Sequence, residues 1–179
     1  MSVGSSEDIV LEESWQIFVE QYPQVMKAYR RMAKMAWFRN DYWVAFVGHY
    51  TNGIFMQVYK PHWYNHEFEG IHFELALDAH CLKSNIASVQ LHITHKNILP
   101  DRDQFNQYTI PRMAELVRPW GPRYELSETK LSERLNLNVP FTQSNFAQKV
   151  ADEIAQVCQL GMIIDEALSR LWGRELQRG

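Results

Sequence analysis

The chain has 179 residues, of which 46% are hydrophobic and 22% charged, and its formal net charge at pH 7 is -3. These values are ordinary for a globular protein, and a small negative net charge gives no general attraction to nucleic acid or to an anionic membrane. No signal-peptide pattern opens the sequence, and no apolar run approaches the roughly 20 residues that a membrane-spanning helix needs. Cys81 and Cys158 form no Cys-x-x-Cys motif. We therefore expect a single domain, residues 1–179, in the cytoplasm.

The first predicted element is a helix over residues 9–36. Apolar residues recur there at steps of three and four, beginning at Trp15, which is the spacing of one helix face. Ser6 is a suitable N-cap residue. Pro23 predicts that the helix is kinked or divided in two.

A basic stripe lies in the second half of this helix. Its members follow the spacing i, i+3, i+4, i+7 and are Lys27, Arg30, Arg31 and Lys34. Such a stripe could bind phosphate or an acidic protein. The alternative is the solvated side of an amphipathic helix, whose C-terminal end favours cations. The negative net charge makes nucleic acid an unexpected partner.

Residues 41–61 predict a β-hairpin. The pair Asn52-Gly53 separates two runs rich in β-branched and aromatic residues, a strong signal for a two-residue turn. With this pair at the centre of the turn, Val47 would lie opposite Val58. Both faces of the hairpin are then apolar, and one carries aromatic side chains: Tyr42, Phe46, Tyr50, Phe55 and Tyr59. Because an exposed antiparallel pair usually has one polar face, we expect helices on both sides or a partner on the aromatic face.

Two amphipathic strands are predicted within residues 70–95, joined by a loop at about residues 79–86. All seven histidines of the chain lie between residues 49 and 95. His72, Glu74 and His92 are expected to project from one face of the two strands, where they could bind a divalent metal ion, with Asp78 as a further carboxylate. The alternative is that these are the solvated positions that strand alternation requires. The unknown register leaves both interpretations open.

The last third of the chain predicts a helix at residues 102–118 broken by Pro111, and a second, weaker hairpin at residues 123–139. Ser144 can cap a long helix that reaches about residue 172. Apolar residues in this helix form a heptad seam that includes Ile164 and Leu168. The seam either packs on the sheet or forms an interface with a second copy of the chain.

The sequence also contains the residues of a nuclease signature motif. Asp101 follows a proline, and Glu128 begins the triplet Glu-Thr-Lys, which matches the pattern PD…ExK. In nucleases with that signature the two acids bind Mg²⁺. Here Asp101 opens a predicted helix and Glu128 falls in a predicted turn, so a chance match is the main alternative.

The predicted order α-ββββ-α-ββ-α indicates an α+β fold, with a mainly antiparallel sheet flanked by N- and C-terminal helices. The runs "GIHFELALD", "ASVQLHIT" and "RYELSETKLSERLNLNV", with the helix from Ser144, resemble in layout a bacterial and archaeal domain of unknown function that accompanies PD-(D/E)xK nuclease-like regions. The likeness covers roughly residues 40–172 and rests on hydrophobic patterns, so it implies no site residue. The element order is also similar to that of the type III secretion chaperones, which are small, acidic, dimeric and non-enzymatic.

Two functional hypotheses follow. In the first, the protein is a non-enzymatic binding or adaptor protein, a homodimer without a cofactor, that uses the aromatic hairpin face and the seam at Ile164 and Leu168. In the alternative, it is a metal-dependent hydrolase of the phosphodiesterase or nuclease type. The divalent metal would then bind to His72, Glu74 and His92, or less favourably to the acids of the nuclease-like pattern.

Overall fold

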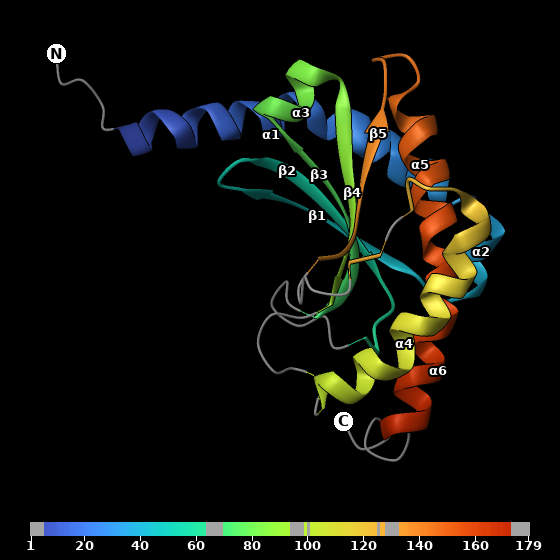
Figure 1. Ribbon diagram of the computed structural model, residues 1–179. Coiled ribbons are helices and arrows are strands. Elements are labelled where there is room, and N and C mark those ends of the chain that lie inside the picture. Colours follow the sequence, from blue (N-terminus) through green and yellow to red (C-terminus); the bar gives the residue numbers. More distant parts are fainter. Residues whose placement is uncertain are drawn as a thin grey trace, which may run out of the picture.

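The computed structural model describes residues 6–63, 70–93, 99, 101–124, 126–127 and 133–172. These residues form one five-stranded antiparallel sheet, with helices from the N-terminal and C-terminal parts of the chain packed against it (Figure 1). The α+β class and the flanking helices are therefore confirmed. Among the described residues, no helix is both long and apolar enough to cross a membrane.

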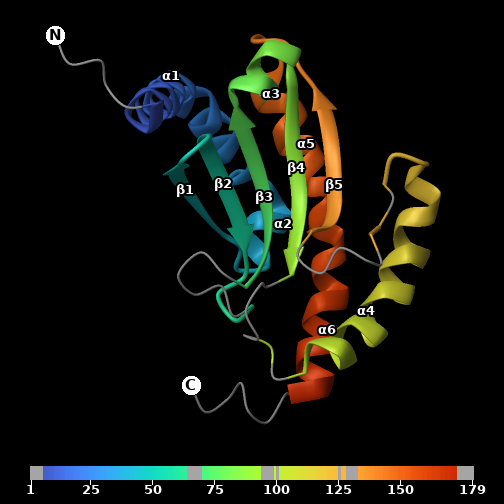
Figure 2. The same ribbon diagram turned by 60° about the vertical axis from the view of Figure 1, so that its left-hand side comes forward.

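The strands lie side by side in chain order, and each is antiparallel to its neighbour (Figure 2). Their bounds are β1 Val44–Tyr50, β2 Gly53–Tyr59, β3 Ile71–Asp78, β4 Ile86–Ile93 and β5 Glu133–Pro140. The helical elements are α1 Ser6–Met32, α2 Ala36–Asn40, α3 Ala79–Ser84, α4 Arg102–Val117, η1 Arg118–Trp120, α5 Phe146–Val157, η2 Cys158–Leu160 and α6 Gly161–Trp172.

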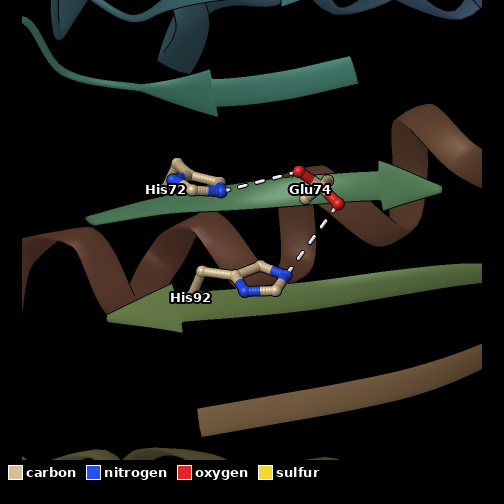
Figure 3. Close-up of side chains that lie close together, drawn as sticks. All are labelled: His72, Glu74 and His92. Carbon is tan, nitrogen blue, oxygen red and sulfur yellow. Dashed lines mark ion pairs between the residues drawn. The ribbon is translucent and has the colours of Figure 1, made fainter. Parts of the chain in front are cut away.

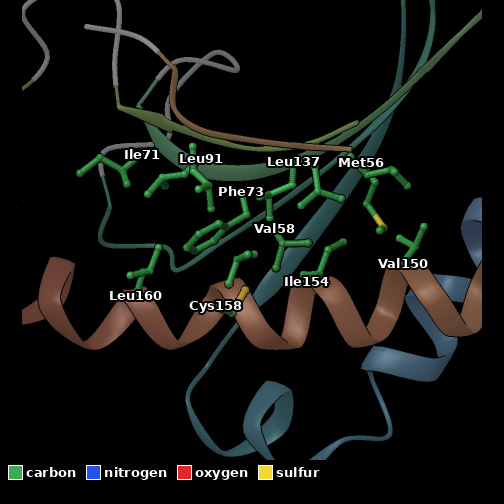
Figure 4. Packing of buried hydrophobic residues seen from close by; sticks show 14 of the residues in the cluster. Met56, Val58, Ile71, Phe73, Leu91, Leu137, Val150, Ile154, Cys158 and Leu160 are labelled. Carbon is green, nitrogen blue, oxygen red and sulfur yellow. The ribbon is translucent and has the colours of Figure 1, made fainter. Parts of the chain in front are cut away.

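One face of the sheet is the core face. Alternate residues of every strand point from it toward α1, α5 and α6, as Phe73, Leu91 and Leu137 do in Figure 4. Ile154 of α5 lies opposite them and is fully buried. The heptad seam therefore packs inside the chain. Ile164 and Leu168, predicted as interface residues, are only 0% and 1% exposed, so they belong to the core and form no surface contact.

The prolines do not divide the helices that contain them. Helix α1 continues through Pro23 and helix α4 through Pro111, so the predicted break of the second helix is wrong. A proline removes one backbone hydrogen bond, but packing of buried residues on both sides of it holds each helix together. In α1 these include Ile17 and Val25, and both lie in the core.

The hairpin forms, but its register differs from the prediction by two residues. Val47 pairs with Met56 and Tyr50 with Gly53, so Thr51 and Asn52 occupy the turn. The reason is Gly53, which opens β2 with φ +151°, where a Cβ atom would lie 2.2 Å from the carbonyl oxygen of Leu77 in β3. Glycine is needed in the strand rather than in the turn. Because the shift is even, the side chains within the two paired strands keep their predicted faces.

Three local predictions are also corrected. The expected loop at residues 79–86 contains α3, because the Asp78 carboxylate accepts a hydrogen bond from the Cys81 N–H at 2.7 Å and caps it. In the described part of the second hairpin, Leu126 forms a bridge with Leu135 and the Ser127 N–H donates to the Arg134 carbonyl oxygen at 2.9 Å, while β5 pairs along its length with β4. The N-cap of α5 is Asn145 rather than Ser144.

Candidate functional site

The face of the sheet that points away from α1 and α5 combines polar and aromatic side chains; Figure 2 looks onto it. We call it the second face. The register places His72 of β3 directly opposite His92 of β4, and Glu74 opposite Gln90. The neighbouring strand β2 contributes Gln57, which pairs with Glu74. Residues from three strands thus meet near the middle of the sheet.

His72, Glu74 and His92 converge in space (Figure 3). One nitrogen or oxygen atom from each lies within 4.8 Å of the corresponding atoms of the other two. His72 Nε2 is 3.6 Å from Glu74 Oε2, and His92 Nε2 is 3.9 Å from Glu74 Oε1. The two imidazole rings stack with centroids 5.0 Å apart and planes at 18°. The predicted sharing of one face is therefore found, and the three residues form what we call the His–Glu–His cluster.

The His–Glu–His cluster is largely shielded from solvent. His72 is only 3% exposed, and its Nδ1 atom is buried without a hydrogen-bond partner among the described residues. Leaving such a group unpaired costs about 1–3 kcal/mol. The cluster is therefore not organised as a complete hydrogen-bond network.

Two glutamine side chains contact the His–Glu–His cluster. Gln57 Nε2 donates a hydrogen bond to Glu74 Oε2 at 3.2 Å. Gln90 Oε1 lies 2.6 Å from His92 Nε2, and because an amide oxygen can only accept, His92 donates this bond. Gln90 Nε2 in turn donates to Ser88 Oγ at 2.9 Å. These contacts fix the orientation of the carboxylate and of one imidazole.

The carboxyl group of Glu74 favours its ionised form. Burial by itself would raise its pKa, but the adjacent His72 and His92 rings and the amide of Gln57 act in the opposite direction and lower the pKa below its usual range. The cluster therefore brings together one ionised, partly buried carboxylate and the ring nitrogens of two imidazoles.

An aromatic hollow adjoins the cluster. It is lined by Phe46 and Tyr50 of β1 and Phe55 of β2, has a volume of about 390 Å³, and extends to Gln57 and Glu74. Phe55 contacts Phe46 and Tyr50 at centroid distances of 5.8 and 5.7 Å. Three of the five aromatic residues predicted for this face therefore lie together.

Gly48 shapes this hollow. It pairs with Phe55 across the hairpin, and a Cβ atom at Gly48 would lie 2.5 Å from Phe55 Cζ and 2.8 Å from Phe46 Cε1. The two phenyl rings lean over the glycine because no side chain is there. The phenol of Tyr50 borders the hollow, and burial, followed by the negative charges of Asp78 and Glu74, raises its pKa. The carboxylates of Asp78 and Glu74 therefore both act on the phenol at the edge of the hollow.

The other two aromatic residues predicted for the face do not line the hollow. Tyr42 precedes β1, has φ +57° and is 83% exposed. Tyr59 is half-buried and packs against the core.

The remaining predicted residues do not come together with the cluster. The basic stripe Lys27, Arg30, Arg31 and Lys34 is exposed along and just after the end of α1. Asp101 is the N-cap of α4 and accepts a hydrogen bond from the Gln104 N–H at 2.9 Å, which is a structural role. Glu128 lies outside the described residues, so the nuclease-like pattern stays an untested prediction.

The histidines that are close in sequence are dispersed in the structure. His49 lies on the core face, with Nε2 3.0 Å from Ser14 Oγ of α1. His80 is exposed on α3. His62 contacts Asp165. Of the histidines in the described part of the chain, His72 and His92 are the pair that share a site.

One polar network could not have been anticipated from motifs. Asp165 of α6 accepts hydrogen bonds from Lys60 Nζ at 2.6 Å, from His62 Nε2 at 2.8 Å and from Trp63 Nε1 at 2.7 Å. Trp63 is fully buried. This network ties the segment after β2 to the last helix.

Comparison of the chain with protein-family models, with curated proteins and with solved structures gives no match. The layout resemblance to a domain of unknown function therefore stays a prediction.

Proposed function

We propose that this protein is a non-enzymatic binding protein that holds an extended segment of another protein along strand β1. The observation that carries the proposal is the aromatic hollow of about 390 Å³ formed by Phe46, Tyr50 and Phe55 at the edge of the sheet. The hollow receives one apolar side chain of the bound segment.

The position of β1 supports this mode of binding. It is the first strand of the sheet and pairs with β2 on one side. In an antiparallel sheet, alternate residues of an edge strand direct their N–H and C=O groups outward. An added strand would form main-chain hydrogen bonds with these groups and place alternate side chains over the second face.

The charges beside the hollow indicate the chemistry of the segment. Glu74 borders the hollow, and with Asp78 it makes the surroundings of Tyr50 negative. A segment that carries an apolar side chain with a basic residue nearby complements both features.

The test is selection of peptides from a random linear library displayed on phage, followed by fluorescence anisotropy with the selected peptides. We expect extended sequences with an apolar and a basic residue. Phe46→Ser and Gly48→Ala, which remove or narrow the hollow, should each weaken binding by about tenfold or more. Tyr42→Asn, an aromatic position outside the hollow, should leave binding unchanged. A library that yields no binder, or binders indifferent to Phe46→Ser, contradicts the proposal.

We also propose that two copies associate through α1. Helix α1 carries an exposed apolar stripe formed by Trp15, Val19 and Tyr22. Acidic residues dominate the first half of this helix and basic residues, including Arg30 and Arg31, its end. Antiparallel pairing of two such helices brings opposite charges together on either side of the apolar stripe.

A further inference from the structure

We propose that the His–Glu–His cluster is a binding site for one divalent first-row transition-metal ion of the Zn²⁺ type. The inference is independent of the binding of a partner segment. It concerns His72, Glu74 and His92, which lie on the two central strands β3 and β4.

The donor set is the first argument. Two imidazole nitrogens and one carboxylate oxygen are ligands that Zn²⁺ and neighbouring transition metals prefer, whereas Mg²⁺ and Ca²⁺ prefer oxygen ligands alone. A site with three protein ligands retains a position for water or substrate, which is the arrangement of catalytic zinc sites.

The spacing of the donors is the second argument. The contacts from Glu74 to His72 Nε2 and His92 Nε2, at 3.6 and 3.9 Å, are too long for hydrogen bonds, which lie at 2.7–3.2 Å. Ligands about 2.0–2.1 Å from a tetrahedral Zn²⁺ ion are separated from one another by about 3.3 Å. The two contacts of Glu74 exceed this value by about 0.3 and 0.6 Å, and the ligand atoms of all three residues lie within 4.8 Å of one another. Rotation of the side chains has to close these distances when an ion binds.

The surroundings of the ligands are the third argument. His72 and His92 form a cross-strand pair, and Glu74 is two residues from His72 on the same strand, so the backbone fixes all three positions. Gln57 holds the carboxylate by a hydrogen bond, which is the kind of outer contact that orients metal ligands. In the structure Gln90 Oε1 contacts His92 Nε2, so an ion must replace that hydrogen bond.

The experiment uses the full chain without an affinity tag, dialysed against EDTA and then against metal-free buffer. Isothermal titration with ZnCl₂ should show one equivalent of Zn²⁺ bound, and Co²⁺ should give the visible absorption of a tetrahedral site. Mg²⁺ should give no heat of binding. His92→Gln and Glu74→Gln should each weaken Zn²⁺ binding by about 100-fold or more. His80→Gln, an exposed histidine on α3, is the matched control and should bind as the wild type does.

Absence of stoichiometric Zn²⁺ binding by the wild-type chain overturns the proposal. So does binding that His92→Gln and Glu74→Gln leave unchanged, since the ion would then lie elsewhere on the surface. Circular dichroism verifies that each variant is folded. If one variant does not fold, the other variant and the Co²⁺ spectrum of the wild type decide the question.

Discussion

Asp165 joins two segments of the chain that are about a hundred residues apart. Its carboxylate accepts hydrogen bonds from Lys60, His62 and Trp63. The indole N–H of Trp63 belongs to a fully buried side chain, and its acceptor in the structure is the Asp165 carboxylate. The arrangement stabilises the contact between the segment after β2 and helix α6.

Substitution of Asp165 tests this role. We expect Asp165→Ala to lower the free energy of unfolding by about 1–3 kcal/mol, because the Trp63 indole N–H is left buried and unpaired. Asp165→Asn keeps an acceptor oxygen and should cost less. Urea denaturation at pH 7, followed by tryptophan fluorescence, measures both. Equal destabilisation by the two variants would argue against the role assigned to the indole hydrogen bond.

The same residue gives a pH dependence. Burial alone would raise the pKa of Asp165, but the hydrogen bonds from His62, Lys60 and Trp63 lower it below its usual value of about 3.9. A lowered pKa in the folded state means that the ionised group stabilises the fold above pH 3.9, and that this contribution is lost as the pH falls through the lowered pKa. The stability difference between wild type and Asp165→Asn should therefore shrink in acid. A constant difference from pH 7 to 3.5 would contradict it.

Sequence alone predicted the residues whose placement depends on strand alternation. His72 and Glu74 share a face because they are two residues apart, and no other information is needed. Asp165 could not be predicted, because its partners are set by the packing of α6 against the segment after β2. Gln57 was equally hidden, since one polar residue in an otherwise apolar strand has no distinctive pattern.

The β1–β2 hairpin contains two glycines, Gly48 and Gly53, and a side chain would be unfavourable at each for a different structural reason. Gly53 has a positive φ, and its missing side chain would meet the backbone oxygen of Leu77. At Gly48 the missing side chain would meet only the ends of the Phe46 and Phe55 rings. Backbone cannot move away without breaking the pairing of β2 with β3, whereas phenyl rings can rotate.

We therefore expect the two glycines to respond differently to substitution. Gly53→Ala should lower the free energy of unfolding by about 2–4 kcal/mol, through backbone strain and overpacking. Gly48→Ala should change it by about 1 kcal/mol or less, since a better strand residue offsets the displaced rings. Urea unfolding of both variants measures the difference. Similar losses in the two would show that the rings over Gly48 are as rigid as backbone.

At the level of elements, regular apolar periodicity predicted the strands, but the hairpin register and the short helix α3 were not predicted. The strands at Ile71–Asp78 and Ile86–Ile93 follow from alternation. The hairpin register did not, because the need for glycine at the start of β2 comes from contact with β3, which is distant in sequence. The short helix α3 depends on Asp78 as its N-cap. This role was missed because Asp78 also fits the alternation of polar and apolar residues in β3.

For the whole molecule, the exposed stripe on α1 is the expected site of self-association. Val19 is 54% exposed at its centre. Val19→Glu should weaken dimerisation by about tenfold or more, because a charge would be buried in the contact. Met162→Glu, which changes an exposed apolar residue of α6, is the control. Size-exclusion chromatography with light scattering over a range of concentrations measures the mass; a monomer at every concentration for the wild type contradicts self-association.

At this scale the sequence predicted that helices cover the sheet, but it did not predict which apolar surfaces pack inside the chain and which stay exposed. Amphipathic strands flanked by amphipathic helices give one covered sheet. The sequence did not decide whether the heptad seam of α5 and α6 packs on the sheet or on another chain. The same apolar spacing suits both kinds of packing. In the structure the seam completes the core, so Ile164 and Leu168 are not available as a binding surface.

Phe73 lies between His72 and Glu74 in the chain and points into the core. Insertion or deletion of one residue in β3 would therefore turn the imidazole and carboxylate inward and the phenyl ring outward. The polar residues of the second face and the apolar residues of the core face therefore depend on the same alternation of side chains along β3. We infer that these strands tolerate replacement of individual side chains but not changes of length, and that variation in length is confined to the connections between them.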